Sequence, residues 1–359
     1  MQQQDQDNLR FSGHVRPAFT HIDSRSNSLD WTSQSLFQLR ARLNADYRIS
    51  PSLQFRARLV GKVSSDTNSF EFWYHPYAPS RSGLTNGKAT FDMFLLQWDV
   101  NNRLSIQAGR MQHAFQLRGL IPKSFDRYHS QNLASTWSNG IWARWSAFDS
   151  WDVHFIAQYN HLKGSGSAFS SPLNFENPAS RISYFAAFES TDNTGFWRQR
   201  GFGVSMVPGS ITRNGEDRDY YLFSGRAGIL LPADFQWTDI TLHAELSYAP
   251  IVPDNAQFNL KEETPANSGA LGWQASLNFE KLFERQALSV LYGYAQPGML
   301  LAPSFRNNTD TWEVRYQFRF TNKVSTEVRY RIRNQEFVPD GAASARLDRD
   351  LYVRLTIRI

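Results

Sequence analysis

The chain has 359 residues, a formal net charge of +5 and a mean hydropathy of −0.50. No stretch approaches the ~18 apolar residues of a membrane helix, which excludes a helical membrane protein. Cysteine is absent, so disulfide frameworks and thiolate metal sites are excluded as well. The basic charges stand at alternate positions rather than in runs, so the sequence predicts no nucleic-acid partner.

The first eight residues are polar and lack the apolar region of a secretory signal. We expect residues 1–8 to be a disordered N-terminal segment of the mature form. No internal repeat, linker or low-complexity segment follows, so residues 9–359 are predicted to form a single domain.

Strict alternation of apolar and polar residues is the main structural signal. In Phe37–Ile49 apolar residues occupy the odd positions and polar residues the even ones, and Leu351–Ile359 repeats the pattern. A period of two indicates an extended strand with one apolar and one polar face. Because the pattern recurs along the chain and aromatic residues make up 14% of it, we interpret the apolar faces as lipid-facing.

Sixteen segments carry this pattern, each about long enough for a tilted membrane strand. They are residues 9–21, 36–49, 53–64, 91–100, 103–111, 135–148, 151–162, 181–190, 196–207, 219–231, 237–249, 270–280, 286–296, 310–320, 324–334 and 348–359. In 91–100 and 135–148 both faces carry apolar residues, so the inward face is not assigned there.

Short links alternate with long loops along this series of strands. The long loops are expected at 22–35, 65–90, 112–134, 163–180, 208–218, 250–269, 297–309 and 335–347. The sequence therefore predicts an all-β fold, a closed antiparallel transmembrane β-barrel of about sixteen strands with short periplasmic turns and long extracellular loops. The even count places both termini on the periplasmic side of a Gram-negative outer membrane. A large soluble β-sandwich or propeller is the alternative to this fold.

Barrel closure makes the last strand a neighbour of the first, and this merges several basic faces into one lumen wall. Only Asp46, Glu313 and Glu327 are expected to oppose the cations on these faces, so the wall predicts a preference for anions. Its basic residues are Arg10, Arg16, Arg40, Arg42, Arg48, Arg56, Arg58, Lys62, Arg315, Arg319, Arg329, Arg331, Arg333, Arg354 and Arg358.

The third long loop carries a resemblance to known families. The whole layout resembles the sixteen-stranded bacterial outer-membrane porins. The stretch Gln107–Arg110 and the basic loop after it resemble the phosphate-selective porin and alginate-export groups. The resemblance implies that the third loop folds into the lumen and forms a constriction. Its residues would be Arg118, Lys123, Ser124, Asp126, Arg127, Tyr128 and His129. Lysines are few and scattered, so phosphate specificity is not predicted.

The sequence thus predicts a diffusion channel for small anionic solutes, with no enzymatic activity, cofactor or metal. No Gly-x-Ser-x-Gly motif occurs, and Asp152 with His154 supplies too few metal ligands. Expected partners are outer-membrane lipid and lipopolysaccharide. By resemblance the protein is a homotrimer, with Trp73, Tyr74 and Tyr77 of loop 65–90 as a latch. Two alternatives stay open: a conduit for an acidic polysaccharide, and a scaffold barrel housing a partner protein.

Overall fold

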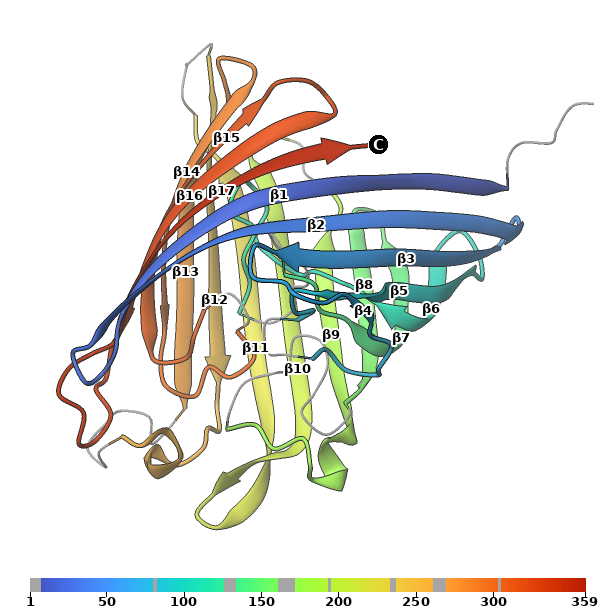
Figure 1. Cartoon of the computed structure of the whole chain (residues 1–359). Coiled ribbons are helices and arrows are strands. Elements are labelled where there is room, and N and C mark those ends of the chain that lie inside the picture. Colours follow the sequence, from blue (N-terminus) through green and yellow to red (C-terminus); the bar gives the residue numbers. More distant parts are fainter. Residues whose placement is uncertain are drawn as a thin grey trace, which may run out of the picture.

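The computed structural model describes residues 8–79, 83–125, 134–160, 172–192, 195–232, 237–260, 269–302 and 305–359. Apart from the two-residue β4, these residues form sixteen antiparallel strands, and β17 pairs with β1 to close the barrel (Figure 1). The predicted all-β, closed, sixteen-stranded barrel is therefore confirmed. Among the described residues no helix is long and apolar enough to cross a membrane.

Each of the sixteen predicted segments corresponds to one strand. The strands are β1 (Leu9–Arg25), β2 (Trp31–Ser50), β3 (Leu53–Ser64), β4 (Glu71–Phe72), β5 (Lys88–Asp99), β6 (Leu104–Met111), β7 (Ser138–Phe148), β8 (Trp151–Tyr159), β9 (Ile182–Ser190), β10 (Trp197–Arg213), β11 (Glu216–Leu230), β12 (Asp239–Ala249), β13 (Ala270–Leu282), β14 (Gln286–Ala295), β15 (Thr309–Arg319), β16 (Val324–Gln335) and β17 (Leu347–Arg358). Two short 3₁₀ helices, η1 (Pro178–Arg181) and η2 (Asn255–Phe258), lie between strands.

Two predicted long loops are wrong. Residues 22–35 mostly continue β1 and β2, which are joined by residues 26–30, and residues 208–218 mostly continue β10 and β11. The β10–β11 turn is the pair Asn214 and Gly215, both with positive φ (54° and 77°), as a two-residue hairpin turn requires. Both hairpins extend beyond the apolar belt, where backbone pairing needs no apolar side chains, so the alternation of residue types does not reveal them.

The second predicted loop, 65–90, contributes to the barrel wall. Glu71 and Phe72 of β4 pair in parallel with Lys88 and Ala89 of β5, beyond the end of β6. The guanidinium of Arg110 lies 4.8 Å from the ring centroid of Tyr74 and 4.9 Å from that of Trp137. Tyr74, a predicted latch residue, is thus held against its own barrel, and its latch role stays a prediction.

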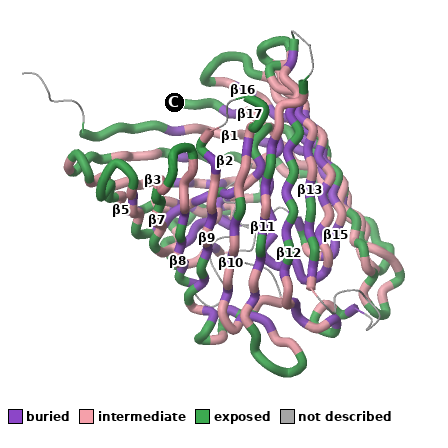
Figure 2. The backbone as a smooth tube through the Cα atoms, turned by 180° about the vertical axis from the view of Figure 1, so that it is seen from behind, coloured by how far each residue is buried: buried purple, intermediate pink, exposed green. Residues whose placement is uncertain are grey.

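The strands turn polar side chains inward and apolar side chains outward. In β12, Thr241, His243 and Glu245 are buried, whereas Leu242 and Leu246 between and after them are exposed. This alternation of burial follows the long strands of the barrel (Figure 2). A soluble β-protein has an apolar interior, whereas the interior of this barrel is polar, so hydrogen-bonding groups line the lumen.

An apolar cluster lies inside the barrel near the end that carries the long loops, here called the long-loop end. Ile121 and Phe125 of the third loop pack there with Phe305 and with Val207 and Leu222 of β10 and β11. The rings of Phe125 and Phe305 stack with centroids 4.6 Å apart. The cluster fixes the third loop against β10–β14, so the remaining lumen lies toward the other wall.

Candidate functional site

The third loop enters the barrel directly after β6. Gln199 of β10 donates its Nε2 to the carbonyl of Gln116 (2.8 Å), and its Oε1 accepts the backbone N–H of Arg118 (2.9 Å). Further along, the backbone N–H of Leu120 donates to Oδ1 of Asn278 on β13 (3.3 Å). Because Gln199 and Asn278 are buried, inward-facing side chains, residues 116–120 lie inside the lumen against these strands.

A glycine makes this close approach feasible. Gly119 has φ +100°, and a Cβ on it would lie 2.8 Å from Oδ1 of Asn278. The backbone conformation therefore favours glycine at this position, and any larger residue would also displace the Asn278 side chain. The loop is positioned by a specific fit to the wall rather than by general polarity.

Two predicted constriction residues anchor the loop. The Nζ of Lys123 lies 2.7 Å from Oε2 of Glu313 on β15, and Oγ of Ser124 donates to Oε1 of Glu245 on β12 (3.2 Å). Glu245 also accepts the backbone N–H of Phe125 at 3.2 Å. Lys123 and Ser124 are 1% and 0% exposed, so their side chains face the wall and not the open lumen.

Burial changes the protonation of this anchor. Removing the Lys123 ammonium from water lowers its pKa from 10.5 to about 7, and the nearby Glu313 carboxylate offsets this only in part. Arg315 and Arg331, also close to Lys123, add to the lowering. The anchor therefore titrates near neutral pH.

Arg118 differs from the two anchors because its side chain is exposed within the lumen. No carboxylate in the described part of the chain forms an ion pair with it. The other predicted constriction residues, Asp126, Arg127, Tyr128 and His129, lie outside the described residues.

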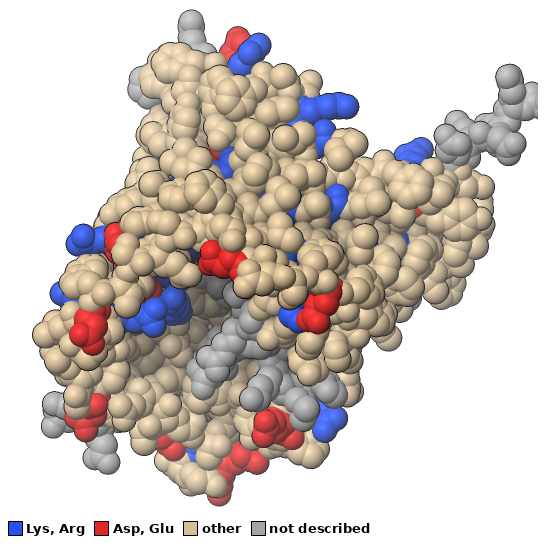
Figure 3. All heavy atoms as spheres, in the orientation of Figure 1, with Lys and Arg blue, Asp and Glu red and all other residues tan. Residues whose placement is uncertain are grey.

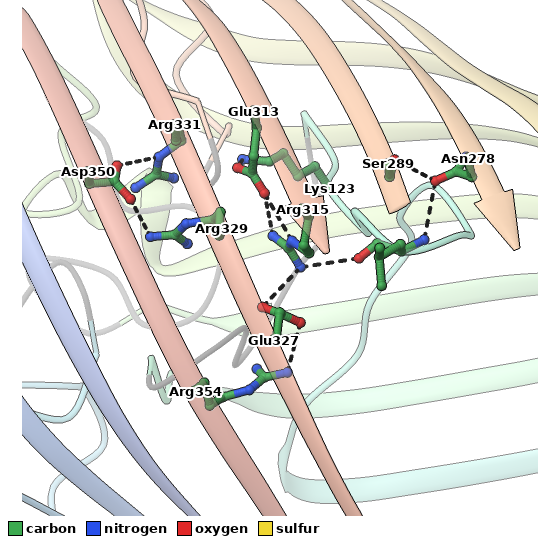
Figure 4. Close-up of polar contacts among 11 residues, drawn as sticks. Lys123, Asn278, Ser289, Glu313, Arg315, Glu327, Arg329, Arg331, Asp350 and Arg354 are labelled. Atoms are coloured by element: carbon green, nitrogen blue, oxygen red, sulfur yellow. Dashed lines mark hydrogen bonds and ion pairs between the residues drawn. The ribbon is translucent and has the colours of Figure 1, made fainter. Parts of the chain in front are cut away.

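The wall beside the apolar cluster, formed by β15, β16 and β17, is a network of arginines and carboxylates (Figure 4). Arg315 contacts Glu313 of its own strand at 2.5 Å and donates to the Leu120 carbonyl of the third loop at 3.2 Å. Glu327 of β16 lies 2.8 Å from Arg354 and 3.7 Å from Arg315. One network thus joins β15, β16, β17 and the third loop.

The expectation that only Asp46, Glu313 and Glu327 oppose the basic wall is wrong. Asp350 of β17 contacts Arg329 at 2.5 Å and Arg331 at 2.7 Å, with Arg333 at 3.9 Å. Asp350 shares the inward face of β17 with Arg354 and lies within the predicted strand 348–359, so the expectation overlooked a carboxylate that the alternation already turned inward. Asp348, also inward on β17, pairs with Arg306 and with Arg346.

Asp92 is the other missed carboxylate. It is fully buried and contacts Arg42 at 2.6 Å and Arg58 at 2.7 Å. It lies on β5, whose two faces both carry apolar residues, so the sequence did not reveal its direction. Asp46, which was predicted, pairs with Arg56 at 2.9 Å. Much of the basic wall is therefore neutralised.

Several predicted wall residues form no ion pair with a carboxylate of the described chain. Arg40 is 0% exposed, donates to the Ala134 carbonyl (2.7 Å), and stands opposite Arg16 on β1 and Lys62 on β3. Of the predicted wall residues, Arg10, Arg48, Arg319 and Arg358 are exposed near the short-turn end, where the described chain begins and ends. The wall thus keeps a positive excess at this end.

A cavity of about 800 Å³ lies between the third loop and this wall. Ala114, Gln116 and Arg118 line it from the loop, and His243 lines it from β12. The hollow seen in Figure 3 opens at the long-loop end, and its edge also carries Lys or Arg side chains beside carboxylates. The charged residues of the cavity are Arg16, Arg118, Arg198, Lys281, Arg285, Arg315, Arg319 and Arg354 against Glu280, Glu284 and Glu327.

The sequence-based reasoning missed part of this lining. Arg198, Lys281 and Arg285 come from strands and turns outside the predicted wall, and the polar contacts Gln199 and Asn278 are uncharged. In β10 and β13 the alternation shows which residues face the lumen, but nothing in the sequence shows which of these residues the third loop contacts. In the described residues no group of three or more His, Asp and Glu side chains could hold a metal.

No protein-family model and no curated protein matches the sequence. Solved structures match over almost the whole chain. OprB of Pseudomonas putida superposes with a TM-score of 0.62 at 9% identity, covering 98% of this chain and 94% of that one. The outer membrane channel DcaP of Acinetobacter baumannii gives 0.61 at 10%, covering 98% and 97%. The chain has the sixteen-stranded porin fold.

A third structure with this porin fold is the anion-selective porin from Comamonas acidovorans, with a TM-score of 0.60 and 9% identity over 98% of this chain and 99% of that one. Identities this low establish the architecture only. These matches do not test the narrower resemblance to the phosphate-selective porin and alginate-export groups.

Proposed function

We propose that this chain is an outer-membrane diffusion channel, not an enzyme, and that it prefers small anionic solutes. The observation that carries the proposal is the cavity of about 800 Å³ in which eight Lys and Arg side chains meet three carboxylates. The anion-selective porin from Comamonas acidovorans, which shares the fold, agrees with this assignment.

The outer surface supports the membrane location. Exposed aromatic residues ring the barrel near both ends, as expected for side chains at the two membrane interfaces. Near the short-turn end they include Trp98, Trp145, Phe148, Phe196, Trp197, Trp237, Phe283 and Phe320. Near the long-loop end they include Tyr159, Tyr184, Tyr248, Trp273, Trp312 and Tyr330. We assign the short-turn end and both termini to the periplasm.

Selectivity follows from the net charge along the path. A unit charge ~8 Å from an ion in water contributes about 0.5 kcal/mol, so three net charges contribute about 1.5 kcal/mol, or about tenfold in relative permeability. The low-dielectric wall strengthens this field. Arg118 has the most direct role, because it is exposed on the third loop while Lys123 is bound to Glu313. An anion drawn in by this field is held only weakly at any one position and leaves again.

The two alternatives receive less support. A polysaccharide conduit needs a third loop that leaves the lumen open, whereas residues 116–125 dock across the inner wall. A scaffold barrel needs space for a partner protein, and the third loop and apolar cluster occupy that space at the long-loop end.

The test is the zero-current potential across a planar bilayer containing the purified protein in a tenfold KCl gradient. We expect chloride selectivity, reduced about twofold by Arg118→Ala, as one charge at ~8 Å predicts. Arg103→Ala removes an exposed arginine from the β5–β6 turn, outside the cavity lining, and should leave the selectivity unchanged. Cation selectivity would refute the anion preference, and the absence of conductance would refute the channel itself.

A further inference from the structure

The outer face of the β17–β1 seam holds a groove that the channel does not use. It is a shallow, open groove of about 460 Å³, lined mostly by apolar side chains. Phe37 and Leu39 of β2 line it and are 64% and 39% exposed. The next residue of β2, Arg40, points the other way and is buried in the lumen wall. The groove therefore lies on the surface that faces the hydrocarbon of the membrane.

Pro17 explains why the groove forms here. The pairs Val15–Ile357 and Ala18–Arg354 flank Pro17, and no pair joins β1 to β17 between them. Proline lacks the N–H that a strand donates to its neighbour. The rings of Phe19 and Phe37, with centroids 4.9 Å apart, stand on the long-loop side of this interruption. Pro17, Leu39 and Leu355 line the space next to them.

A cationic patch follows the groove toward the long-loop end. The outward positions of β1 after Phe19 are His21, Asp23 and Arg25. Asp23 stands opposite Arg349 of β17. Arg25 stands opposite Trp31 of β2. The Arg349 guanidinium lies 5.9 Å from the Trp31 ring centroid. At ~3.3 Å per residue, the Arg349 row is ~13 Å from Phe19.

Neither arginine of the patch forms an ion pair with a carboxylate of the described chain. Arg25 donates to the Ala345 carbonyl at 3.2 Å, and Asp23 lies 3.4 Å from His21 rather than against Arg349. Arg349 and Trp31 are exposed, and Trp31 is placed where aromatic residues meet the membrane interface. An apolar groove with two guanidinium groups ~13 Å beyond it has the polarity of an acylated phosphate.

We propose that this seam binds lipopolysaccharide, with one acyl chain in the Pro17 groove and a lipid phosphate at Arg25 and Arg349. The inference rests on the proposed orientation, because only the leaflet at the long loops presents its phosphates to this patch. Arginine favours phosphate through paired hydrogen bonds. The bound chain covers the interruption at Pro17 and stabilises the closure of the barrel.

The experiment measures lipid binding to the delipidated, folded protein and its variants. Native mass spectrometry detects the bound lipid, and the midpoint temperature of thermal unfolding reports the stabilisation that the lipid gives. The probes are purified lipopolysaccharide and phosphatidylglycerol. We expect lipopolysaccharide to raise the midpoint and to bind about thirtyfold more weakly to the Arg25→Gln/Arg349→Gln double variant, about fivefold per arginine. Arg103→Gln is the matched charge control and should bind as the unaltered protein does.

A second variant tests the groove without touching the charges. Val63→Phe fills the lining and should reduce lipopolysaccharide binding, whereas Leu246→Phe adds a ring to the exposed outer face of β12 and should not. Equal binding of phosphatidylglycerol, or equal binding by all variants, would overturn the proposal. Chloride selectivity is measured on the same samples. If the unaltered protein conducts but does not bind lipopolysaccharide, the seam site alone is refuted. If it binds lipopolysaccharide but does not conduct, the channel alone is refuted.

Discussion

At the residue scale, the lumen contains two kinds of carboxylate. Asp92 is completely buried, binds Arg42 and Arg58, and accepts a hydrogen bond from Ser135 Oγ at 2.6 Å. Asp46 forms a single ion pair with Arg56, with side chains 28% and 33% exposed. Breaking a buried pair strands a charge away from water, whereas an exposed pair contributes little.

This contrast predicts unequal effects of the same substitution. Asp92→Asn leaves Arg42 buried beside a neutral amide, and we expect it to reduce the free energy of unfolding by about 3–5 kcal/mol. Asp46→Asn should cost at most ~1 kcal/mol. Urea-dependent unfolding of the two variants in detergent micelles, followed by tryptophan fluorescence, measures both. Equal losses for the two variants would show that burial does not govern these pairs.

At the scale of elements, the strands were predictable and their docking partners were not. The alternation in segments such as 310–320 and 324–334 located β15 and β16 to within two residues, because a lipid-facing strand needs an apolar residue at every second position. The ends of the hairpins at Arg25 and Arg213 extend beyond the apolar belt and need no apolar residue at alternate positions, so the alternation did not locate them. The fit of Gly119 against Asn278 depends on which parts of the barrel meet in space, and no periodicity encodes that.

The third loop should respond to pH through Lys123. Its ammonium, buried against Glu313 with Arg315 and Arg331 nearby, has a pKa lowered to about 7. Above that pH the loop loses one positive charge, so we expect chloride selectivity to decline between pH 6 and pH 8. The folded pKa lies below the ordinary 10.5, so folding releases this proton, and the free energy of unfolding rises with pH from about 7 to 10.5.

Two variants isolate this titration. Lys123→Met removes the charge at every pH, so its selectivity should be constant and close to that of the unaltered protein at pH 8. Lys123→Arg keeps a charge that does not titrate in this range, so its selectivity should remain at the pH 6 value. If Lys123→Met retains the full pH dependence in zero-current potentials, the titrating group is elsewhere.

At the scale of the whole molecule, closure turns distant sequence segments into one wall. Residues 10–62 and 315–358 meet only because β17 pairs with β1, and this part of the site could be predicted from the sequence once a barrel was inferred. The compensation by Asp92 could not, because both faces of its strand carry apolar residues. Asp348 and Asp350 stand at inward positions of the predicted strand 348–359, and only the arginines that they reach were hidden. The net positive charge therefore acts mainly as a long-range field and not as a row of vacant binding groups.

A long-range field has a distinct dependence on salt. The Debye length falls from about 10 Å at 0.1 M to about 3 Å at 1 M ionic strength, so charges on the wall are screened from the path at high salt. We expect the chloride preference, measured as a zero-current potential at a constant tenfold gradient, to fall severalfold when both solutions are made ten times more concentrated. Selectivity produced by direct contact at Arg118 would persist at high salt and disappear in Arg118→Ala. If salt leaves the chloride preference unchanged in both the unaltered protein and Arg118→Ala, then pore size and not the charge of the lumen determines the selectivity.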